Sequence, residues 1–104
     1  MVLEVAVLDV IEAKQERFEA DFRKAQALVA SMQGYLCHRL QKCIEKPSRY
    51  LLLVQWETLE DHTEGFRGSP EYQEWKDLLH HYYDPFPEVE HYEGRFEGSA
   101  GVSS

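Results

Sequence analysis

The stretch VLEVAVLDV, residues 2–10, decides the fold, because an extended chain of this composition is apolar on both faces. Successive side chains of a strand point to opposite faces, giving two apolar sets: Leu3, Val5 and Val7 on one side, and Val2, Ala6 and Leu8 on the other. Residues 50–57, YLLLVQWE, have the same property, with Leu51 and Leu53 on one side and Leu52, Val54 and Trp56 on the other. Strands that are apolar on both faces are normally covered on both, so these segments predict two central strands.

Helical periodicity follows the first strand. Through residues 12–32, apolar residues recur at steps of three and four, which predicts an amphipathic helix of about five to six turns. These residues are Ile11, Phe18, Phe22, Ala25, Val29 and Met32. Gly34 follows as a stop signal. Residues 35–45 then read as a more polar strand, and KPSR at 46–49 reads as a turn into the next strand.

Residues 56–75, WETLEDHTEGFRGSPEYQEW, predict a helix that begins with a cap and is then interrupted. Thr58 and Asp61 have the spacing of a capping box, in which each side chain bonds to the other residue's backbone. The interrupting residues are Gly65, Gly68, Ser69 and Pro70. The Ser-Pro pair is typical of a new N-cap followed by a first helical residue. We therefore expect two helical pieces.

The second helical piece carries large side chains at helical spacing. It ends before Asp84-Pro85, and a last strand is expected near residues 89–93. A broken helix lifts off its sheet locally, and rings around such a gap predict a small apolar pocket. The residues expected to contact a ligand there are Phe66, Tyr72, Trp75 and Leu79. Plain packing of the helix is the alternative explanation for these side chains.

The order of elements is β-α-β-β-α-β, the ferredoxin-like arrangement of the α+β class. Right-handed crossovers place both helices on one face of a four-stranded antiparallel sheet. The opposite face, which carries the second apolar set of both central strands, would then be exposed over several hundred Å², more than a soluble monomer usually tolerates. We therefore expect a second copy to cover it, as a homodimer with a barrel-like core, a dimeric α+β barrel.

The chain has 104 residues and a net charge of −8. This length predicts one domain, residues 1–95, and the Gly/Ser-rich end predicts a flexible tail, residues 96–104. The acidic balance argues against nucleic acid or an anionic membrane as a partner, because both need a basic face. No apolar run approaches the roughly 20 residues that cross a bilayer, and no signal peptide is recognised. Cys37 and Cys43 are too far apart on one strand to form a disulfide, so a cytoplasmic location is expected.

The order of motifs resembles one family. A tryptophan at the end of the third strand, the stretch HTEGFRGSPEYQEW and the C-terminal FPEVEHY occur on the expected elements. Together they resemble a branch of the antibiotic biosynthesis monooxygenase superfamily, over residues 2 to 93. Members of this superfamily oxidise polycyclic aromatic substrates without flavin or metal, degrade haem, or isomerise small carbonyl compounds. The resemblance therefore implies a cofactor-independent monooxygenase acting on a small apolar or aromatic, quinol-like molecule.

Three residues are candidates for catalysis. His62 could take or give a proton at neutral pH, with a capping or solvent-facing role as the alternative. Arg67 could pair with a phenolate or acidic oxygen of the ligand, or it could tether Glu64 or a neighbouring subunit. The resemblance to cofactor-independent oxygenases implies that Trp56 lines the cavity against a flat substrate. A core anchor between sheet and helix is the alternative role for Trp56.

The sequence also bears on other kinds of chemistry, namely a metal site, haem degradation and isomerisation. No His, Asp or Glu spacing indicates a metal site, and no phosphate loop or nucleophile elbow is present, so neither a metal nor a cofactor is expected. Haem-degrading relatives use an asparagine on the first strand and a helical histidine; this chain has no asparagine in residues 2–10 and has Trp75 and Lys76 in the helical stretch. These differences argue against haem degradation, for which only His80 or His81 leaves a small opening. Two more hypotheses fit the same pocket: an isomerase with the same base, and a binding or stress protein that sequesters a hydrophobic molecule.

Overall fold

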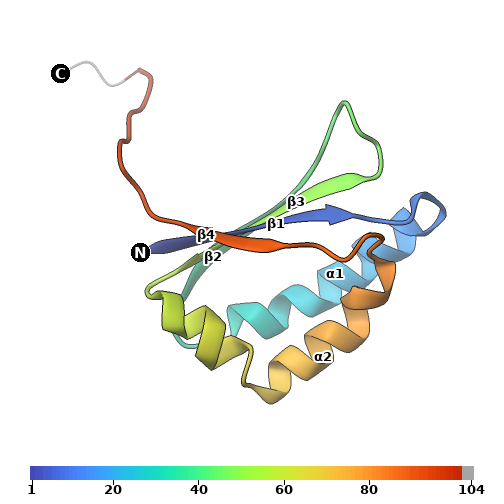
Figure 1. Ribbon diagram of the computed structural model, residues 1–104, viewed down its shortest axis with the longest axis horizontal. Helices are drawn as coiled ribbons and strands as arrows, with labels where there is room; N and C mark the ends of the chain where they lie inside the picture. Colours follow the sequence, from blue (N-terminus) through green and yellow to red (C-terminus); the bar gives the residue numbers. More distant parts are fainter. Residues whose placement is uncertain (102–104) are drawn as a thin grey trace.

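The computed structural model describes residues 1–101, which form a four-stranded antiparallel sheet with the helices on one of its faces (Figure 1). The strands are β1 (Val2–Asp9), β2 (Tyr35–Lys42), β3 (Arg49–Trp56) and β4 (Val89–Tyr92). The helical elements are η1 (Glu12–Lys14), α1 (Gln15–Ala30), η2 (Asp61–Phe66), α2 (Pro70–Leu79) and η3 (His80–Tyr82). This order confirms the predicted α+β, ferredoxin-like fold.

The two strands that are apolar on both faces lie at the centre of the sheet, as predicted, in the order β2-β3-β1-β4. Ala6 of β1 lies opposite Leu52 of β3 on one side and opposite Val89 of β4 on the other. In the same β1–β4 register, Glu4 lies opposite His91. Directly opposed residues of paired strands share a face, so Glu4 and His91 lie side by side on the face that the helices cover.

The first main helix is shorter than the predicted 12–32, because residues 12–14 form a separate 3-10 turn and α1 ends at Ala30. Its buried stripe is the predicted one: Phe18, Phe22, Ala25 and Val29. Gly34, the predicted stop signal, has a φ of 83°. A Cβ at this position would also collide with the carboxylate of Asp61. Only glycine satisfies both constraints, so the chain can turn sharply into β2 here.

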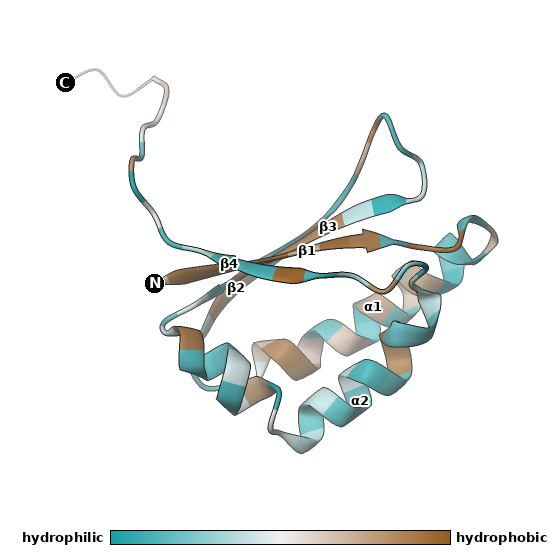
Figure 2. Cartoon of the chain, viewed as in Figure 1, coloured by the Kyte–Doolittle hydropathy of each residue, from teal (hydrophilic) through white to brown (hydrophobic). Residues whose placement is uncertain are grey.

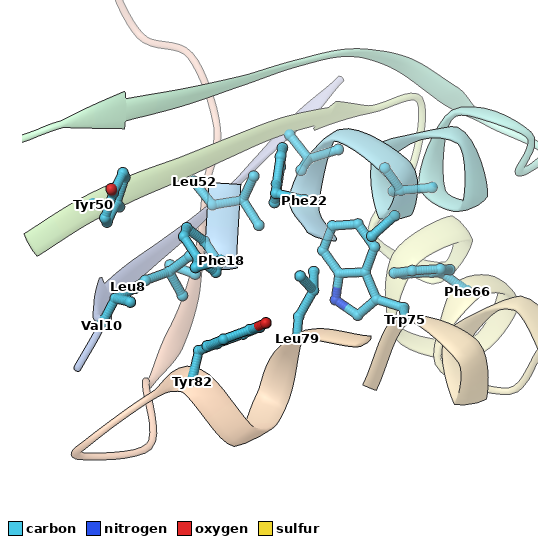
Figure 3. Close-up of a cluster of buried hydrophobic side chains, with 14 of the residues drawn as sticks. Leu8, Val10, Phe18, Phe22, Tyr50, Leu52, Phe66, Trp75, Leu79 and Tyr82 are labelled. Carbon is cyan, nitrogen blue, oxygen red and sulfur yellow. The ribbon is translucent and has the colours of Figure 1, made fainter. Parts of the chain in front are cut away.

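The core lies between the sheet and the two main helices (Figure 3). Phe18 is fully buried, and its ring centroid lies 5.0 Å from that of Tyr50 and 5.7 Å from that of Tyr82. Trp75 of α2 packs edge-on against Phe22 of α1 and against Phe66. Each fully buried apolar side chain of this size contributes roughly 1.5–3 kcal/mol, so the aromatic cluster holds α1 and α2 firmly on the sheet.

The helix predicted after β3 is interrupted, as expected. The capping box is present: Thr58 N donates to Asp61 Oδ2 and Asp61 N donates to Thr58 Oγ1, both at 3.2 Å. The break comes at Gly68, where a Cβ would lie 2.6 Å from the carbonyl oxygen of Glu64. Ser69 then caps α2, and its hydroxyl accepts a backbone N–H of the first turn at 3.1 Å. These local signals delimit both helical pieces.

The prediction that Gly65 interrupts the helix is wrong. Gly65 lies inside η2, which is a π-helix, and a Cβ there would meet only the carbonyl oxygen of Glu60, at 3.7 Å. In η2 the backbone N–H of Arg67 donates to the carbonyl of His62, five residues earlier, at 3.1 Å. This widened turn directs His62 and Phe66, both buried, toward the sheet.

The other face of the sheet is not covered by any part of residues 1–101 (Figure 1). The central strands carry apolar residues there: Leu3, Val5, Val7, Leu51 and Leu53. In Figure 2, β1 has the colour of strongly hydrophobic residues, and all the helices of the described residues lie on one side of the sheet, so the opposite side is left bare. This is the second apolar face that the sequence predicts, and Val7 on it is 38% exposed.

Two strand ends differ slightly from expectation. β2 ends at Lys42 rather than at residue 45, and β4 ends at Tyr92 rather than at residue 93. Beyond β4 the chain runs away from the sheet in Figure 1, and Phe96 is 97% exposed. The predicted tail, residues 96–104, includes residues 102–104, which lie outside the described residues. Within residues 1–101, no helix combines the length and apolarity that crossing a membrane requires.

Candidate active site

A cavity of about 360 Å³ lies between the sheet and the second helical region. The sheet lines one side of it with Glu4, Ala6, Leu8, Leu52 and Val89. The helical region lines the other side with His62, Phe66, Arg67, Tyr72, Trp75 and His80. The segment before β4 completes the lining with Tyr83, Phe86 and Pro87. This volume is at the lower end of the roughly 300–1,000 Å³ typical of small-molecule sites, and the lining combines apolar and aromatic side chains with several polar and charged ones.

Glu4 is the acidic group on the cavity wall. It is 6% exposed, and it lies on the helix-facing side of β1 together with the apolar Ala6 and Leu8. The indole Nε1–H of Trp56 donates to Glu4 Oε1 at 3.0 Å, and His62 Nε2 lies 3.3 Å from the same oxygen. A charge is costly to bury unless polar groups of the protein replace its hydration. The indole and the imidazole serve this purpose.

Two histidines continue from this carboxylate. The imidazole of His62 is stacked on the indole of Trp56, with ring centroids 5.5 Å apart and planes 20° apart. Its other nitrogen, Nδ1, is hydrogen-bonded to His91 Nε2 at 2.8 Å. Glu4, Trp56, His62 and His91 therefore form one connected group from β1, β3, η2 and β4, which we name the Glu4 cluster.

The positions of the protons in the Glu4 cluster follow from the carboxylate. An ionised Glu4 only accepts, which favours a neutral His62 with its proton on Nε2, the nitrogen 3.3 Å from the carboxylate. His62 Nδ1 then carries a lone pair and accepts the hydrogen bond, which makes Nε2–H of His91 the donor. Both ring nitrogens of His62 are thus engaged by other residues of the protein.

Burial dominates the acid–base properties of the site. It raises the pKa of Glu4 to about 6, against the hydrogen bond from Trp56 and the positive charge of Arg67, which lower it. It lowers the pKa of His62 to about 3, and Arg67 and His91 act in the same direction. At neutral pH the 3.3 Å contact therefore joins a carboxylate to a neutral imidazole and is not an ion pair.

The mouth of the cavity has further polar and aromatic groups. The rings of His80 and Phe86 have centroids 5.1 Å apart, and Phe86 is 64% exposed. Burial lowers the pKa of His80 and raises that of Tyr83, so both side chains are neutral at pH 7. Within residues 1–101, no three His, Cys, Asp or Glu side chains gather into a group that could hold a metal ion.

The structure brings most of the residues proposed from the sequence to one cavity. Those that line it are His62, Arg67, Phe66, Tyr72 and Trp75. Trp56 and Leu79 do not line it, and both are 0% exposed. Trp56 lies behind His62 as a core anchor and as the hydrogen-bond donor to Glu4, whereas Leu79 is part of the hydrophobic core.

Sequence reasoning missed Glu4 and His91. In an extended strand Glu4 points to the same face as Ala6 and Leu8, so it is a single carboxylate on the face assigned to the core. A carboxylate among the apolar residues of one strand face indicates a buried polar site, and the sequence alone shows it. His91 had no comparable signal, because its role depends on which residue of β1 lies opposite it.

A sequence model of the family described as antibiotic biosynthesis monooxygenase matches residues 1–78. This range contains β1, β3 and η2, and therefore every member of the Glu4 cluster except His91. The chain belongs to the antibiotic biosynthesis monooxygenase family. The resemblance inferred from the sequence is thereby confirmed.

Two relatives align with this chain over about nine-tenths of its length. YczJ of Bacillus subtilis (strain 168), an uncharacterized protein, is 58% identical over 93 residues, which is 89% of this chain and 98% of YczJ. The crystal structure of a proposed antibiotic biosynthesis monooxygenase from Bordetella bronchiseptica has a TM-score of 0.87 at 33% identity and covers 91% of this chain and 97% of that one.

A further solved structure of this fold is that of an oxygenase that works without a cofactor. SnoaB from Streptomyces nogalater, a cofactor-independent oxygenase, has a TM-score of 0.68 at 18% identity, with 97% of each chain covered. At 18% identity, the similarity of this chain to SnoaB shows a shared fold and no more. One fold can carry several chemistries, so the reaction has to be argued from the Glu4 cluster and the cavity.

Proposed function

We propose that this protein is a cofactor-independent oxygenase that acts on a small aromatic molecule with an ionisable hydroxyl, such as a quinol or the enol form of an anthrone. The observation that carries the proposal is Glu4, a buried carboxylate on the wall of a cavity with aromatic lining, with a pKa raised to about 6. A general base works best when its pKa lies near the working pH. Membership of the antibiotic biosynthesis monooxygenase family supports the class of reaction.

In this mechanism Glu4 removes the hydroxyl proton of the bound substrate. The resulting enolate or phenolate is electron-rich enough to pass one electron to O₂, and the two radicals combine to form a C–O bond. For an anthrone, the peroxide then loses water and leaves a carbonyl group. One oxygen atom of O₂ replaces the two hydrogens of the reacting carbon, and the other leaves with them as water, so no external reductant is consumed.

We assign the base to Glu4 rather than to His62, the candidate from the sequence. His62 Nδ1 is bonded to His91 and its Nε2 faces Glu4, so neither nitrogen is directed at the cavity. His62 then holds the carboxylate in place. Trp56 contributes in the same way through its indole N–H, which makes it a supporting residue of the site rather than a wall of the cavity.

The remaining lining residues bind and stabilise. Phe66 and Trp75 offer rings to the flat faces of an aromatic substrate. Arg67 contributes a positive charge close enough to lower the pKa of Glu4 and His62, so it stabilises the negative charge that develops on the substrate oxygen. Tyr72 offers a hydroxyl on the same wall.

We also propose that two copies associate through the uncovered face of the sheet. Its central strands present Leu3, Val5, Val7, Leu51 and Leu53. An apolar surface of this kind on a soluble protein is stabilised by removal from water, and a second copy of the same face is the occupant that two-fold symmetry provides. The homodimer leaves the cavity on the helical side of each sheet.

Oxygen consumption with a quinol and with an anthrone tests the reaction. The wild-type protein is expected to consume O₂ in proportion to the substrate oxidised, without added flavin or metal. Glu4→Gln keeps the shape of the side chain but removes the base, so kcat is expected to fall by about 10²–10⁴-fold, while anaerobic binding of the substrate persists. Glu74→Gln, at an exposed position of α2, is the matched control and retains full activity.

Three results would overturn this proposal. One is unchanged oxygen consumption in Glu4→Gln. Another is exchange of substrate protons with solvent without any O₂ consumption, which would indicate an isomerase. The third is binding of these aromatics with no turnover, which would indicate a protein that sequesters hydrophobic molecules.

A further inference from the structure

The outermost member of the Glu4 cluster, His91, does not line the cavity, yet it is connected to the proposed base. Its position is set by the sheet, because β4 pairs with β1 in a register that places His91 opposite Glu4. Residues directly opposite one another in an antiparallel pair keep their Cβ atoms about 5 Å apart. The imidazole of His62 therefore lies against both members of this cross-strand pair, with one ring nitrogen facing each.

His62 has two protonation states, and the hydrogen bond from His91 favours the neutral one, in addition to burial and the charge of Arg67. With Nδ1 unprotonated, His62 is neutral and Glu4 beside it is an available base. With a second proton on Nδ1, His62 is an imidazolium 3.3 Å from the carboxylate, and the ion pair stabilises the charged form of Glu4. The second state makes Glu4 a weaker base. A donor at Nδ1 occupies the lone pair that the second proton would need.

We propose that His91 is a positioning residue that acts through His62: its Nε2–H donates to His62 Nδ1, keeps His62 neutral and leaves Glu4 free to accept a proton from the substrate. The consequence for turnover rests on the proposed function. The protonation pattern does not, because it is a property of the resting protein.

One charged group and several titratable groups from other elements surround the Glu4 cluster, and the charge of Arg67 also favours a neutral His62. Arg67, directly after η2, disfavours a positive charge on His62 and on His91. On α2 and η3, Tyr72 and His80 line the same cavity, and Tyr83 lies on the segment before β4. The remaining neighbour, Trp56 of β3, does not titrate. Among the described residues, only His91 is hydrogen-bonded to His62 Nδ1.

The test is NMR on the resting protein from the lowest pH at which it stays folded up to pH 9, with ¹⁵N-labelled imidazoles and ¹³C-labelled carboxylates. The wild-type protein is expected to show His62 as the neutral Nε2–H tautomer at pH 7. In His91→Leu the donor is lost, so His62 is expected to take up its second proton at a higher pH, and the Glu4 midpoint is expected to fall by about one pH unit. His91→Gln, whose amide N–H can replace the donor, is expected to restore both midpoints toward the wild type.

The wild-type spectrum alone is enough to overturn the proposal, whether or not the leucine variant folds. An Nδ1–H tautomer or an imidazolium at His62 at pH 7 would do so, and so would unchanged midpoints in a folded His91→Leu. Oxygen consumption separates the two proposals. If Glu4→Gln remains fully active while the NMR results stand, the assignment of Glu4 as the base fails and the role of His91 in setting the protonation of His62 is retained.

Discussion

At the scale of single residues, Glu4 owes its properties to one oxygen that has two N–H neighbours and to the apolar strand around it. Both neighbours are neutral, so they orient the carboxylate without cancelling its charge. Burial is then the largest influence on its pKa and moves it upward. The result is a group that is charged at neutral pH but holds its charge at a cost in stability.

This cost predicts a pH-dependent difference between wild type and Glu4→Gln. The folded-state pKa is raised from 4.5 to about 6, so the folded protein binds a proton more tightly than the unfolded chain between these values. The contribution of Glu4 to stability is therefore highest below pH 4.5 and is lost as pH rises through 6. Relative to wild type, Glu4→Gln is expected to gain about 2 kcal/mol between pH 4 and 8, measured by urea unfolding. A difference that is constant with pH would contradict the raised pKa.

Trp56→Phe separates the indole hydrogen bond from the aromatic packing. The hydrogen bond from Trp56 lowers the pKa of Glu4, so its loss is expected to raise that pKa further. Stability at pH 8 should fall by about 1.5–3 kcal/mol, the usual contribution of a hydrogen bond to a charged group, with an added loss from the smaller ring. NMR titration of Glu4 checks the first effect. Trp75→Phe is the control, because Trp75 contacts Phe22 and Phe66 and should leave the Glu4 midpoint in place.

At the scale of elements, the passage from η2 to α2 determines where His62 and Phe66 point. The π-helical turn rotates both toward the sheet, and the break at Gly68 lets α2 start afresh from the Ser69 cap. Two glycines lie close together here but differ in their surroundings, which makes them a matched pair.

Gly68→Ala is expected to destabilise the protein and Gly65→Ala is not. A Cβ at Gly68 would lie 2.6 Å from the carbonyl oxygen of Glu64, so the backbone must shift, whereas at Gly65 the nearest such atom is 3.7 Å away. We expect a loss of about 1–3 kcal/mol for Gly68→Ala, and for Gly65→Ala a change within about 1 kcal/mol, in the stabilising direction because alanine favours helices. Thermal unfolding of both variants measures this, and equal effects would contradict the steric argument.

The fold could be predicted from the sequence, because two strands that are apolar on both faces leave few topologies open, and because Thr58, Gly34 and Ser69 are local signals with local causes. The site could be predicted only in part. His62 and Phe66 follow from helical spacing, but the π-helical turn that directs them to the sheet and includes Gly65 has no clear sequence signal. Glu4 and His91 are separated by most of the chain, and only the β1–β4 register brings them together.

At the scale of the whole molecule, the uncovered sheet face predicts association. Leu53→Glu places a charge at the centre of that face, opposite Val5 of β1. We expect the wild-type protein to sediment as a dimer at micromolar concentration, and Leu53→Glu as a folded monomer, because burying an unpaired carboxylate in the interface is costly. Ala27→Glu, at an exposed position of α1, is the control and should remain dimeric. A wild-type protein that sediments as a monomer of 12.2 kDa would exclude the homodimer.

The strand that carries His91 is the shortest in the sheet and lies at an edge, where β1 is its only neighbouring strand within residues 1–101. Edge strands fray more often than central ones, and their amide hydrogens exchange with solvent sooner. Each time β4 detaches, His62 loses its donor while Trp56, on a central strand, stays in place. If His91 acts as proposed, the protonation of His62 depends on the local unfolding of these four residues as well as on the global stability of the domain. A ligand that bridges the cavity to Val89 would then slow exchange in β4 before it raised the melting temperature.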